Sequence, residues 1–377
     1  MTTKKITQFL ADRRPQTPCL VIDLDVVADN FKKLRAAVPQ AGIYYAVKAN
    51  PAPEILKLLC KVGSNFDTAS INEIDMVLAS GAAADRISYG NTIKKKGDIA
   101  AAYERGVRLY AFDSAGELDK LSDAAPGSRV FCRILTSGAN ADWPLSRKFG
   151  CDVNMAKKLL LEAAKRNVVP YGVSFHVGSQ QRDPNQWDAA VAQAAWLFRE
   201  CEENGVQLTM LNIGGGFPTR YRRIIPGMPA YGAAIDASLR KHFGNRIPDV
   251  IVEPGRQMVG SAGVIQTEVV LISKKAETDR KRWVYLDIGK FGGLIETMDE
   301  SIKYRIQVPE RNGPSAPVVL AGPTCDSADI LYEKHRYRLP LSLKVGDKVR
   351  ILATGAYTTS YASVNFNGFE PLKAAYI

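Results

Sequence analysis

Lys48 is the residue of this sequence with the clearest potential for covalent chemistry, because it follows an apolar run in Tyr-Ala-Val-Lys-Ala-Asn at residues 45–50. A lysine at the end of an apolar strand is partly removed from water, which favours the neutral amine that attacks a carbonyl carbon. The alternative is a surface lysine whose stem packs on the strand while its charge stays in water. The hypothesis of a Schiff-base lysine therefore depends on the other polar residues.

Three consecutive glycines, Gly214, Gly215 and Gly216, follow a strand-like run. Without Cβ atoms they let a backbone approach an anion closely and present N–H groups to it. Tight turns use glycine as freely, and the spacing is not that of a Walker or dinucleotide motif. The run is compatible with a phosphate loop but does not establish one.

Two further side chains have the chemistry to act on a pyridine ring. Glu253, followed by Pro-Gly-Arg, could keep a pyridinium nitrogen protonated, which makes the ring a better electron sink. His176 could stack on a ring, donate a proton, or be a hydrogen-bonded core histidine. Glu253 could equally belong to a structural salt bridge. No second histidine or cysteine lies at ligand spacing from His176, so we expect no metal site.

Cys325 and Asp326 form the third feature, in Gly-Pro-Thr-Cys-Asp-Ser at residues 322–327. A cysteine beside turn-forming residues could be a proton donor or a nucleophile. It could equally be a small buried residue, and its local sequence leaves both interpretations open.

The middle of the chain alternates short β-rich runs with helical patterns in which apolar residues recur every three or four positions. Such alternation predicts parallel strands joined by helices, and eight units over roughly 215 residues fit a (β/α)8 barrel. An open doubly wound sheet is the alternative. The predicted strands are 43–47, 65–68, 87–89, 108–112, 129–135, 171–175, 207–213 and 249–252.

Polar residues and glycines collect at the ends of these runs. In a parallel barrel the side chains at the carboxyl ends of the strands face the active site, so the pattern predicts one site at that face. In chain order the residues are Lys48, Asp67, Asn91, Asp113, Arg133, His176, Gly214 to Gly216, and Glu253.

The chain after residue 255 consists of β-rich runs separated by turn-forming residues, with little helix between them. This pattern predicts a second, all-β domain, and the apolar run at 19–22 could add a strand to it. We therefore expect an N-terminal segment at 1–26 that pairs with the β-domain, the barrel at 27–258, and the β-domain at 259–377.

Composition places the chain among ordinary globular proteins, with 377 residues, 46% hydrophobic and 24% charged. The six cysteines have no pairing or zinc spacing, and neither a signal-peptide core nor a membrane span is evident, so we expect a reduced, cytoplasmic protein without membrane contact. The formal charge of +11 is scattered, with its densest run at 94–96. We interpret it as a solvated basic surface or a field for anionic ligands such as phosphates, and not as a nucleic-acid site.

Seven motifs then resemble, in order, those of the fold-type III pyridoxal-phosphate decarboxylases. The chain is most similar to the ornithine/lysine decarboxylases of the eukaryotic-like kind that bacteria also have, over nearly its whole length. Each motif is modest alone, but seven in the same order are specific. They lie at 45–50, 66–70, 176–179, 214–218, 253–256, 322–326 and 355–357.

The resemblance implies a role for each matching residue. Lys48 would hold pyridoxal 5'-phosphate as a Schiff base, His176 would stack on its ring, and Glu253 would pair with the ring nitrogen. Cys325 would return a proton to Cα, and Asp326 would bind the distal ammonium of the substrate. Asp67, Glu73 and Arg133 would support the lysine side, and the residues around the phosphate would be Ser179, Gly215, Gly216, Gly255, Arg256 and Tyr357.

The implied reaction is decarboxylation of a small basic amino acid in polyamine biosynthesis: L-ornithine to putrescine, with L-lysine to cadaverine as the second candidate. In that family Cys325 and Asp326 act on the site of the other subunit, which implies a homodimer with shared sites. The specificity region departs from the animal enzymes, which have a tyrosine where Phe291 falls. The acidic residue that contacts the substrate is left open among Glu296, Asp299 and Glu300.

Other functions on the same fold are the alternatives. A decarboxylase for diaminopimelate would need cationic groups for a second carboxylate, and enzymes for arginine or carboxynorspermidine share most of the motifs. An amino-acid racemase would use a tyrosine base and no Cys-Asp pair. A non-catalytic regulatory homologue is disfavoured by the intact Lys48, Cys325 and Asp326.

Overall fold

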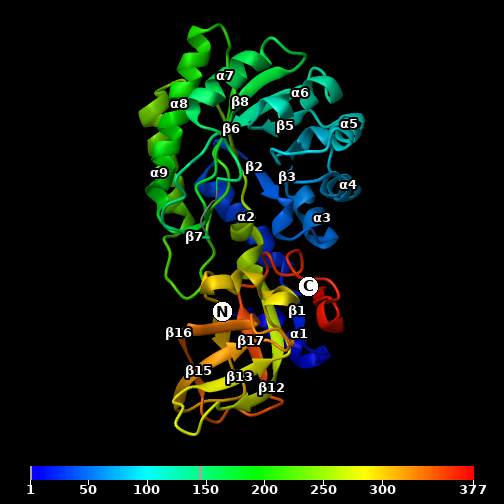
Figure 1. Cartoon of the computed structure of the whole chain (residues 1–377), viewed down its shortest axis with the longest axis vertical. Coiled ribbons are helices and arrows are strands. Elements are labelled where there is room, and N and C mark those ends of the chain that lie inside the picture. The colour runs from blue at the N-terminus through cyan, green and yellow to red at the C-terminus, as the bar shows by residue number, and fades with distance from the viewer. Residues whose placement is uncertain (1, 144–146) are drawn as a thin grey trace. The chain divides into compact units, whose positions relative to one another are not determined.

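The computed structural model describes residues 2–143 and 147–377. Contacts within the chain divide it into two compact units, which can be followed by colour in Figure 1. The unit that we call the barrel unit comprises Ala28–Pro218 and Ile225–Gly255. The second, which we call the β unit, comprises Met1–Val27, Thr219–Ile224 and Arg256–Ile377.

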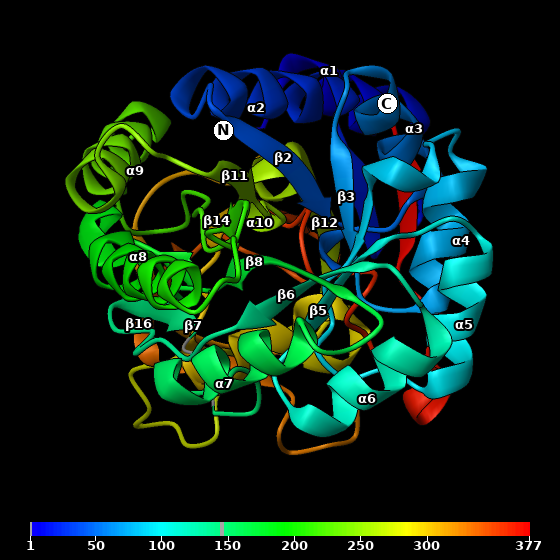
Figure 2. The ribbon, with the colours of Figure 1, turned by 90° about the horizontal axis from the view of Figure 1, so that it is seen from above.

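Eight parallel strands in the described part of the barrel unit close into a barrel, which confirms the predicted (β/α)8 fold over an open sheet. The closure joins β11 to β2, with Val250 opposite Ala41. Figure 2 shows the strands inside a ring of helices. The strands are β2 (Ala41–Ala46), β3 (Asn65–Thr68), β4 (Ile87–Tyr89), β5 (Leu109–Phe112), β6 (Arg129–Arg133), β8 (Val169–Ser174), β10 (Met210–Asn212) and β11 (Asp249–Val252).

Helices surround the barrel strands, as the alternating pattern predicts. Pro53 occupies the first turn of its helix, and Ile55, Leu56 and Leu59 are buried on one face. No helix in the described ranges is long and apolar enough to cross a membrane. The helices are α2 (Leu24–Ala37), α3 (Pro53–Lys61), α4 (Ile71–Ala79), α5 (Lys96–Glu104), α6 (Ala115–Ala124), α7 (Val153–Ala163), α8 (Trp187–Glu203) and α9 (Met228–Phe243).

Some strands are shorter than predicted. Three match their predicted bounds, whereas the run predicted at 207–213 pairs only over Met210–Asn212. Leu208 is buried, whereas Gln207 and Thr209 on either side of it are exposed, which is the alternation of a strand. These three residues lie before the part of the run that is paired with neighbouring strands. Two short strands, β7 (Ala141–Trp143) and β9 (Ser179–Gln181), pair with each other outside the barrel.

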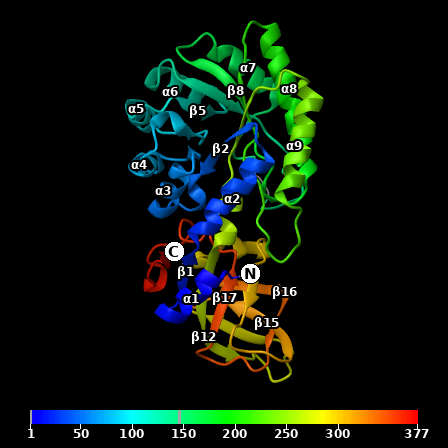
Figure 3. The ribbon, with the colours of Figure 1, turned by 180° about the vertical axis from the view of Figure 1, so that it is seen from behind.

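The β unit contains an eight-stranded mixed sheet within its described residues. The N-terminal strand β1 joins it as predicted, antiparallel to β12 and parallel to β18. Figure 3 shows β12, β15, β16 and β17 of this sheet. The strands are β1 (Cys19–Ile22), β12 (Gly263–Ser273), β13 (Arg282–Leu286), β14 (Arg305–Gln307), β15 (Ser315–Ala321), β16 (Ile330–Pro340), β17 (Lys348–Leu352) and β18 (Lys373–Tyr376), with helices α1 (Lys4–Arg13) and α10 (Arg256–Val259).

Within the range predicted as barrel, the internal segment Thr219–Ile224 groups with the β unit, as do Val27 and residues 256–258 at the two ends. The ring of Tyr221 lies edge-on to Tyr304 with 5.3 Å between centroids, and the backbone N–H of Arg222 donates to Lys303 O at 3.2 Å. Sequence periodicity does not indicate this grouping, because it arises from contacts with residues about 80 positions away.

Candidate active site

Lys48 lies directly after β2, at the carboxyl end of the first barrel strand. It occupies the short turn Val47–Ala49, whose two flanking residues are buried while the lysine side chain is exposed. Tyr45 fixes the turn, because its hydroxyl donates to Asn50 O at 2.9 Å. The amine is therefore carried by a rigid backbone at a position that a ligand can reach.

Two carboxylates on the neighbouring strand and helix interact electrostatically with this lysine. Asp67, at the end of β3, is buried, and its Oδ1 has no hydrogen-bond partner. Burial raises the pKa of Asp67 well above its ordinary value, the charge of Glu253 raises it further, and the charges of Lys48 and Arg133 oppose the shift. Burial also raises the pKa of Glu73, against the charge of Lys48. These five residues thus form one electrostatic cluster.

Gly90, directly after β4, makes room for Asp67. A Cβ at this position would lie 1.9 Å from Asp67 Oδ1, so a side chain here would displace the carboxylate. From the sequence, Gly90 is expected only to lead from the third strand to Asn91, with no role of its own. The available signal was a glycine directly after a strand, which often marks a close approach of backbone to another group.

Arg133 ends β6, and His176 follows β8, which pairs with β6 in the barrel. His176 Nδ1 accepts a hydrogen bond from Gly178 N at 2.9 Å, so a neutral ring carries its proton on Nε2. Burial lowers the pKa of His176 well below its ordinary value, and the charges of Arg133 and Lys48 lower it further. The ring is therefore a neutral, flat surface at neutral pH, suited to stack on another ring.

At the three glycines after β10, a side chain would clash with neighbouring atoms. A Cβ on Gly214 would lie 2.1 Å from Phe175 O, and one on Gly215 would lie 2.5 Å from Glu253 O. Gly214 and Gly216 also have φ of 67° and 102°, in the left-handed region that favours glycine. This backbone fits the predicted phosphate loop. Ser179, in β9, is half-buried.

Asn212 links this loop to Glu253, which follows β11. Its Nδ2 donates to Glu253 Oε1 at 2.5 Å, and its Oδ1 accepts from Gly214 N at 2.9 Å. The carboxylate of Glu253 is thereby oriented by a neighbouring strand. Sequence analysis missed Asn212, for which the only signal was an amide near the end of an apolar strand.

Arg256 and Glu296 form a buried ion pair in the β unit. The two guanidinium nitrogens lie 2.5 and 2.6 Å from the two carboxylate oxygens, and both side chains are about 3% exposed. Arg256 also donates to Tyr221 Oη at 2.8 Å, and its Cζ lies 4.8 Å from the ring centroid of Tyr357. Glu296, predicted to bind substrate, therefore has both oxygens engaged by an arginine that was predicted to bind phosphate. Gly255 directly precedes α10 and is buried.

Replacing Glu296 by alanine is expected to lower the free energy of unfolding by about 3–5 kcal/mol, because it leaves the Arg256 charge buried and unpaired. The matched control is Glu268→Ala, which removes the partly exposed ion pair with Lys348 and should cost less than about 1 kcal/mol. Urea denaturation of the purified variants measures both losses. Equal losses would contradict the assignment of Glu296 to a buried pair.

The other two acidic residues of this segment differ in their surroundings. Glu300 accepts hydrogen bonds from the backbone N–H groups of Glu333, Lys334 and His335 at 2.7, 2.6 and 2.6 Å, so it fixes β16. Asp299 has a φ of 50° and an exposed side chain. Of the acidic residues at 296, 299 and 300, Asp299 is the one on the surface.

Cys325 and Asp326 are both exposed in the β unit, on the loop between β15 and β16. The buried carboxylate of Asp329 fixes this loop, because it accepts hydrogen bonds from Thr324 and, at 2.7 Å, from Lys290 N. Asp329 thereby joins the Cys325 loop to the segment of Phe291. Sequence analysis missed it, since an aspartate among turn-forming residues has no distinguishing pattern.

Phe291 packs against Phe366 with 4.6 Å between ring centroids. Both line a cavity of about 380 Å³ in the β unit, together with Thr324 and the segment Phe369–Lys373. The segment of Phe291 therefore lines a cavity large enough for a small molecule.

The barrel face fits a phosphate-bearing aldehyde cofactor on three observations. A lysine amine is accessible at a strand end, a buried carboxylate oxygen of Asp67 lacks a partner, and the glycine backbone leaves room for an anion. Lys48 could hold such a group, Glu253 could pair with a ring nitrogen, and His176 could stack on the ring.

The chain also resembles known proteins. The family described as pyridoxal-dependent decarboxylase, pyridoxal binding domain, matches residues 24–260. A lysine/ornithine decarboxylase of Selenomonas ruminantium is 37% identical over 369 residues, which are 97% of this chain and 91% of that protein. The crystal structure of the Paramecium bursaria Chlorella virus arginine decarboxylase bound to agmatine has a TM-score of 0.89 at 29% identity, covering 99% of each chain. Antizyme inhibitor 2 of Xenopus laevis is 34% identical, over 93% of this chain and 78% of that protein.

The family match covers the barrel strands that carry Lys48, His176 and Glu253, and the relatives extend it over the β unit. The relatives named as decarboxylases act on basic amino acids, and the family's cofactor is pyridoxal phosphate. The chain therefore belongs to the fold-type III pyridoxal-phosphate decarboxylases of basic amino acids, in the group that includes the lysine/ornithine decarboxylases.

Proposed function

We propose that this protein decarboxylates L-ornithine to putrescine, and L-lysine to cadaverine, as a step of polyamine biosynthesis. The observation that carries this proposal is the pair Cys325 and Asp326, both exposed on a loop that buried Asp329 holds in place. A thiol can return a proton to carbon, and a carboxylate beside it can bind a cationic side chain.

The residues of the barrel unit would hold and orient the cofactor. Lys48 would bind its aldehyde carbon, and the backbone of Gly215 and Gly216 would accommodate its phosphate. When bound, pyridoxal phosphate accepts the electron pair of the breaking bond between Cα and the carboxylate. Glu253, oriented by Asn212, would keep a proton on the ring nitrogen, and His176 would stack on the ring.

Asp67, Glu73 and Arg133 would support the side of the cofactor site on which Lys48 lies. Ser179, Gly255, Arg256 and Tyr357 would complete the phosphate contacts by resemblance to the family. The Arg256 guanidinium is held by Glu296, so this pair would present it in one orientation.

The distal ammonium of the substrate would be bound by Asp326 and Asp299. Asp299 is favoured over Glu296 and Glu300 because the latter two have their oxygens occupied by an arginine and by backbone N–H groups. Phe291, whose ring packs on Phe366, would form an apolar wall along the methylene chain.

We further propose a homodimer in which Cys325 and Asp326 of one subunit serve the cofactor of the other. The β unit exposes three large apolar side chains close in sequence, Tyr361, Val364 and Phe369, with Val364 75% exposed. Exposed apolar residues beside a cavity that includes Phe366 and Thr324 are typical of a protein–protein interface.

Carbon dioxide release should be measured with ornithine, lysine, arginine and diaminopimelate side by side. We expect turnover of ornithine and lysine with kcat/KM values within about 10- to 200-fold of each other, because a pocket discriminates one methylene by about 1–3 kcal/mol. A preference for arginine would instead support the function of the viral relative. Release from none of the four by a protein that binds pyridoxal phosphate would favour a non-catalytic role, as the likeness to an antizyme inhibitor allows.

A further inference from the structure

Lys94 is a lysine buried completely in the barrel unit, with 0% of its side chain exposed. Its Nζ donates to the carbonyl oxygens of Asn91 and Ala111, each at 2.7 Å. It also forms a buried ion pair with Glu117, whose Oε1 lies 3.0 Å from Lys94 Nζ. The ring of Tyr89, with its centroid 5.3 Å from Nζ, adds a cation–π contact.

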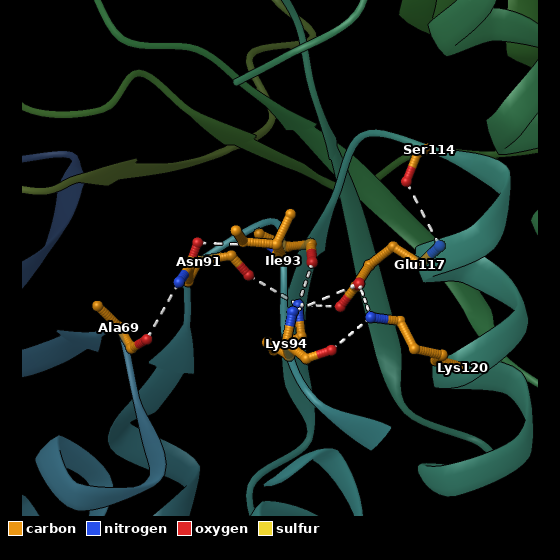
Figure 4. Close-up of polar contacts among 8 residues, drawn as sticks. Ala69, Asn91, Ile93, Lys94, Ser114, Glu117 and Lys120 are labelled. Atoms are coloured by element: carbon orange, nitrogen blue, oxygen red, sulfur yellow. Dashed lines mark hydrogen bonds and ion pairs between the residues drawn. The ribbon is translucent and has the colours of Figure 1, made fainter. Parts of the chain in front are cut away.

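Glu117 is buried as well, and its second carboxylate oxygen contacts another lysine, Lys120. It lies in the first turn of α6, where Ser114 caps the helix by accepting from Glu117 N. Its Oε2 lies 2.5 Å from Lys120 Nζ, and Lys120 also donates to the carbonyl oxygen of Lys94 (Figure 4). The carboxylate is therefore fixed by its own helix and by two lysines.

A series of hydrogen bonds leads from this pair to the cofactor site. Lys94 holds the backbone of Asn91, whose Nδ2 donates to Ala69 O at 3.2 Å, as Figure 4 shows. The N–H of Ala69 donates in turn to Glu73 Oε2 at 2.7 Å. Glu73 is one of the two carboxylates on which the charge of Lys48 acts.

The same loop also determines the position of Gly90. Gly90 N donates to Thr68 O at 3.0 Å, and the missing Cβ of Gly90 makes room for Asp67. A shift of the loop after β4 would therefore move the backbone against which the unpaired Asp67 oxygen lies. Both carboxylates near Lys48 depend on this loop.

Stability alone does not account for Lys94. Burying two charges carries a large desolvation penalty, and apolar residues of similar volume often replace a buried pair without loss of stability. Burial lowers the pKa of Lys94 to about 8, against the charge of Glu117, so the amine is mostly charged at neutral pH and its charge has to be compensated. A pair retained under that penalty is expected to specify one arrangement of the groups around it.

We infer that Lys94, paired with Glu117, is a positioning residue for the cofactor site: it fixes the loop after β4, through which Asn91 holds the backbone of Ala69 and so places Glu73 and Asp67 beside Lys48. Lys94 acts through these residues and is not itself catalytic. The inference rests on the cofactor family and is independent of which amino acid is decarboxylated.

The test compares four variants of the full-length holoenzyme. Lys94→Met and Asn91→Ala each interrupt the series, and Lys94→Met/Glu117→Leu removes both charges and should keep a stability near that of the native protein. Lys157→Met is the matched control, because it removes a lysine–glutamate pair with Glu200 between α7 and α8. The measurements are the dissociation constant of pyridoxal phosphate by absorbance, amide hydrogen exchange over residues 67–73, and kcat and KM separately.

In the three site variants, but not in Lys157→Met, we expect pyridoxal phosphate to bind more weakly by on the order of tenfold, with faster exchange over residues 67–73. We expect kcat to fall by a similar factor while KM changes little. Native cofactor affinity and native exchange in Asn91→Ala and in the folded double variant would overturn the inference. If Lys94→Met does not fold, those two variants decide it in the same way. Failure of every substrate would leave the affinity and exchange readouts intact, so it is distinguishable from failure of this inference.

Discussion

Replacing Lys48 by alanine is expected to abolish the visible absorption band of the lysine-bound cofactor and to lower decarboxylation by at least about a hundredfold. Lys48 is the one residue for which both the sequence motif and the strand-end position predict covalent attachment of the cofactor. Alanine has no amine, so pyridoxal phosphate could bind only through its ring and phosphate contacts. Absorption spectra before and after borohydride reduction measure the loss directly.

Lys57→Ala provides the matched control, since Lys57 is exposed on the adjacent helix α3. This variant should keep the native spectrum and turnover. A Lys48→Ala protein with an unchanged visible band would show that another amine holds the cofactor, and the proposed roles of Asp67 and Glu73 beside Lys48 would fail with it.

Cys325→Ala is expected to be nearly inactive alone and to regain activity in mixed dimers with Lys48→Ala. If each site combines Lys48 of one subunit with Cys325 of the other, a mixed dimer contains one native site and one site that lacks both residues. The isolated mixed dimer should then have about half of the native activity, and an unfractionated mixture of equal amounts about a quarter. Co-expression with two affinity tags, followed by activity measurement on the doubly tagged species, isolates the mixed dimer.

Each inactive variant paired with itself is the control for this experiment and should stay inactive. A mixed dimer without activity would mean that Cys325 serves the site of its own subunit. A monomeric protein in sedimentation would contradict the proposed sharing altogether, although Cys325 could still act as the proton donor within one chain.

The barrel could be predicted because its signals are local. Parallel strands buried on both faces are short apolar runs, and β3 and β11 match their predicted bounds. The positions of Lys48, His176 and Glu253 at strand ends followed from the same pattern, since strand ends in a parallel barrel share one face.

The partners of the site residues could not be predicted from local sequence. Asn212 supports Glu253 from 41 positions away, and Arg256 engages Glu296 from 40 positions away. Glu296 had the correct chemistry for a substrate carboxylate, and only the three-dimensional contact with Arg256 shows that its oxygens are occupied. Lys94 read as part of a solvated basic run at 94–96, whereas its side chain points into the barrel unit and is fully buried.

The pairing of β1 has a consequence for how the protein is made. Its residues Cys19–Ile22 leave the ribosome early, but their partners in β12 and β18 lie about 240 and 350 residues later. At ordinary rates of synthesis, roughly 5–20 residues per second, the second partner is translated about twenty seconds to a minute or more after β1. Until β12 has been made, this wholly apolar strand has both edges unpaired, and one edge stays unpaired until β18 follows, so it can join other chains. The β unit is thus the part of the nascent protein most in need of chaperone protection. The barrel strands all lie between β1 and β12 in the sequence, so they can pair with one another first.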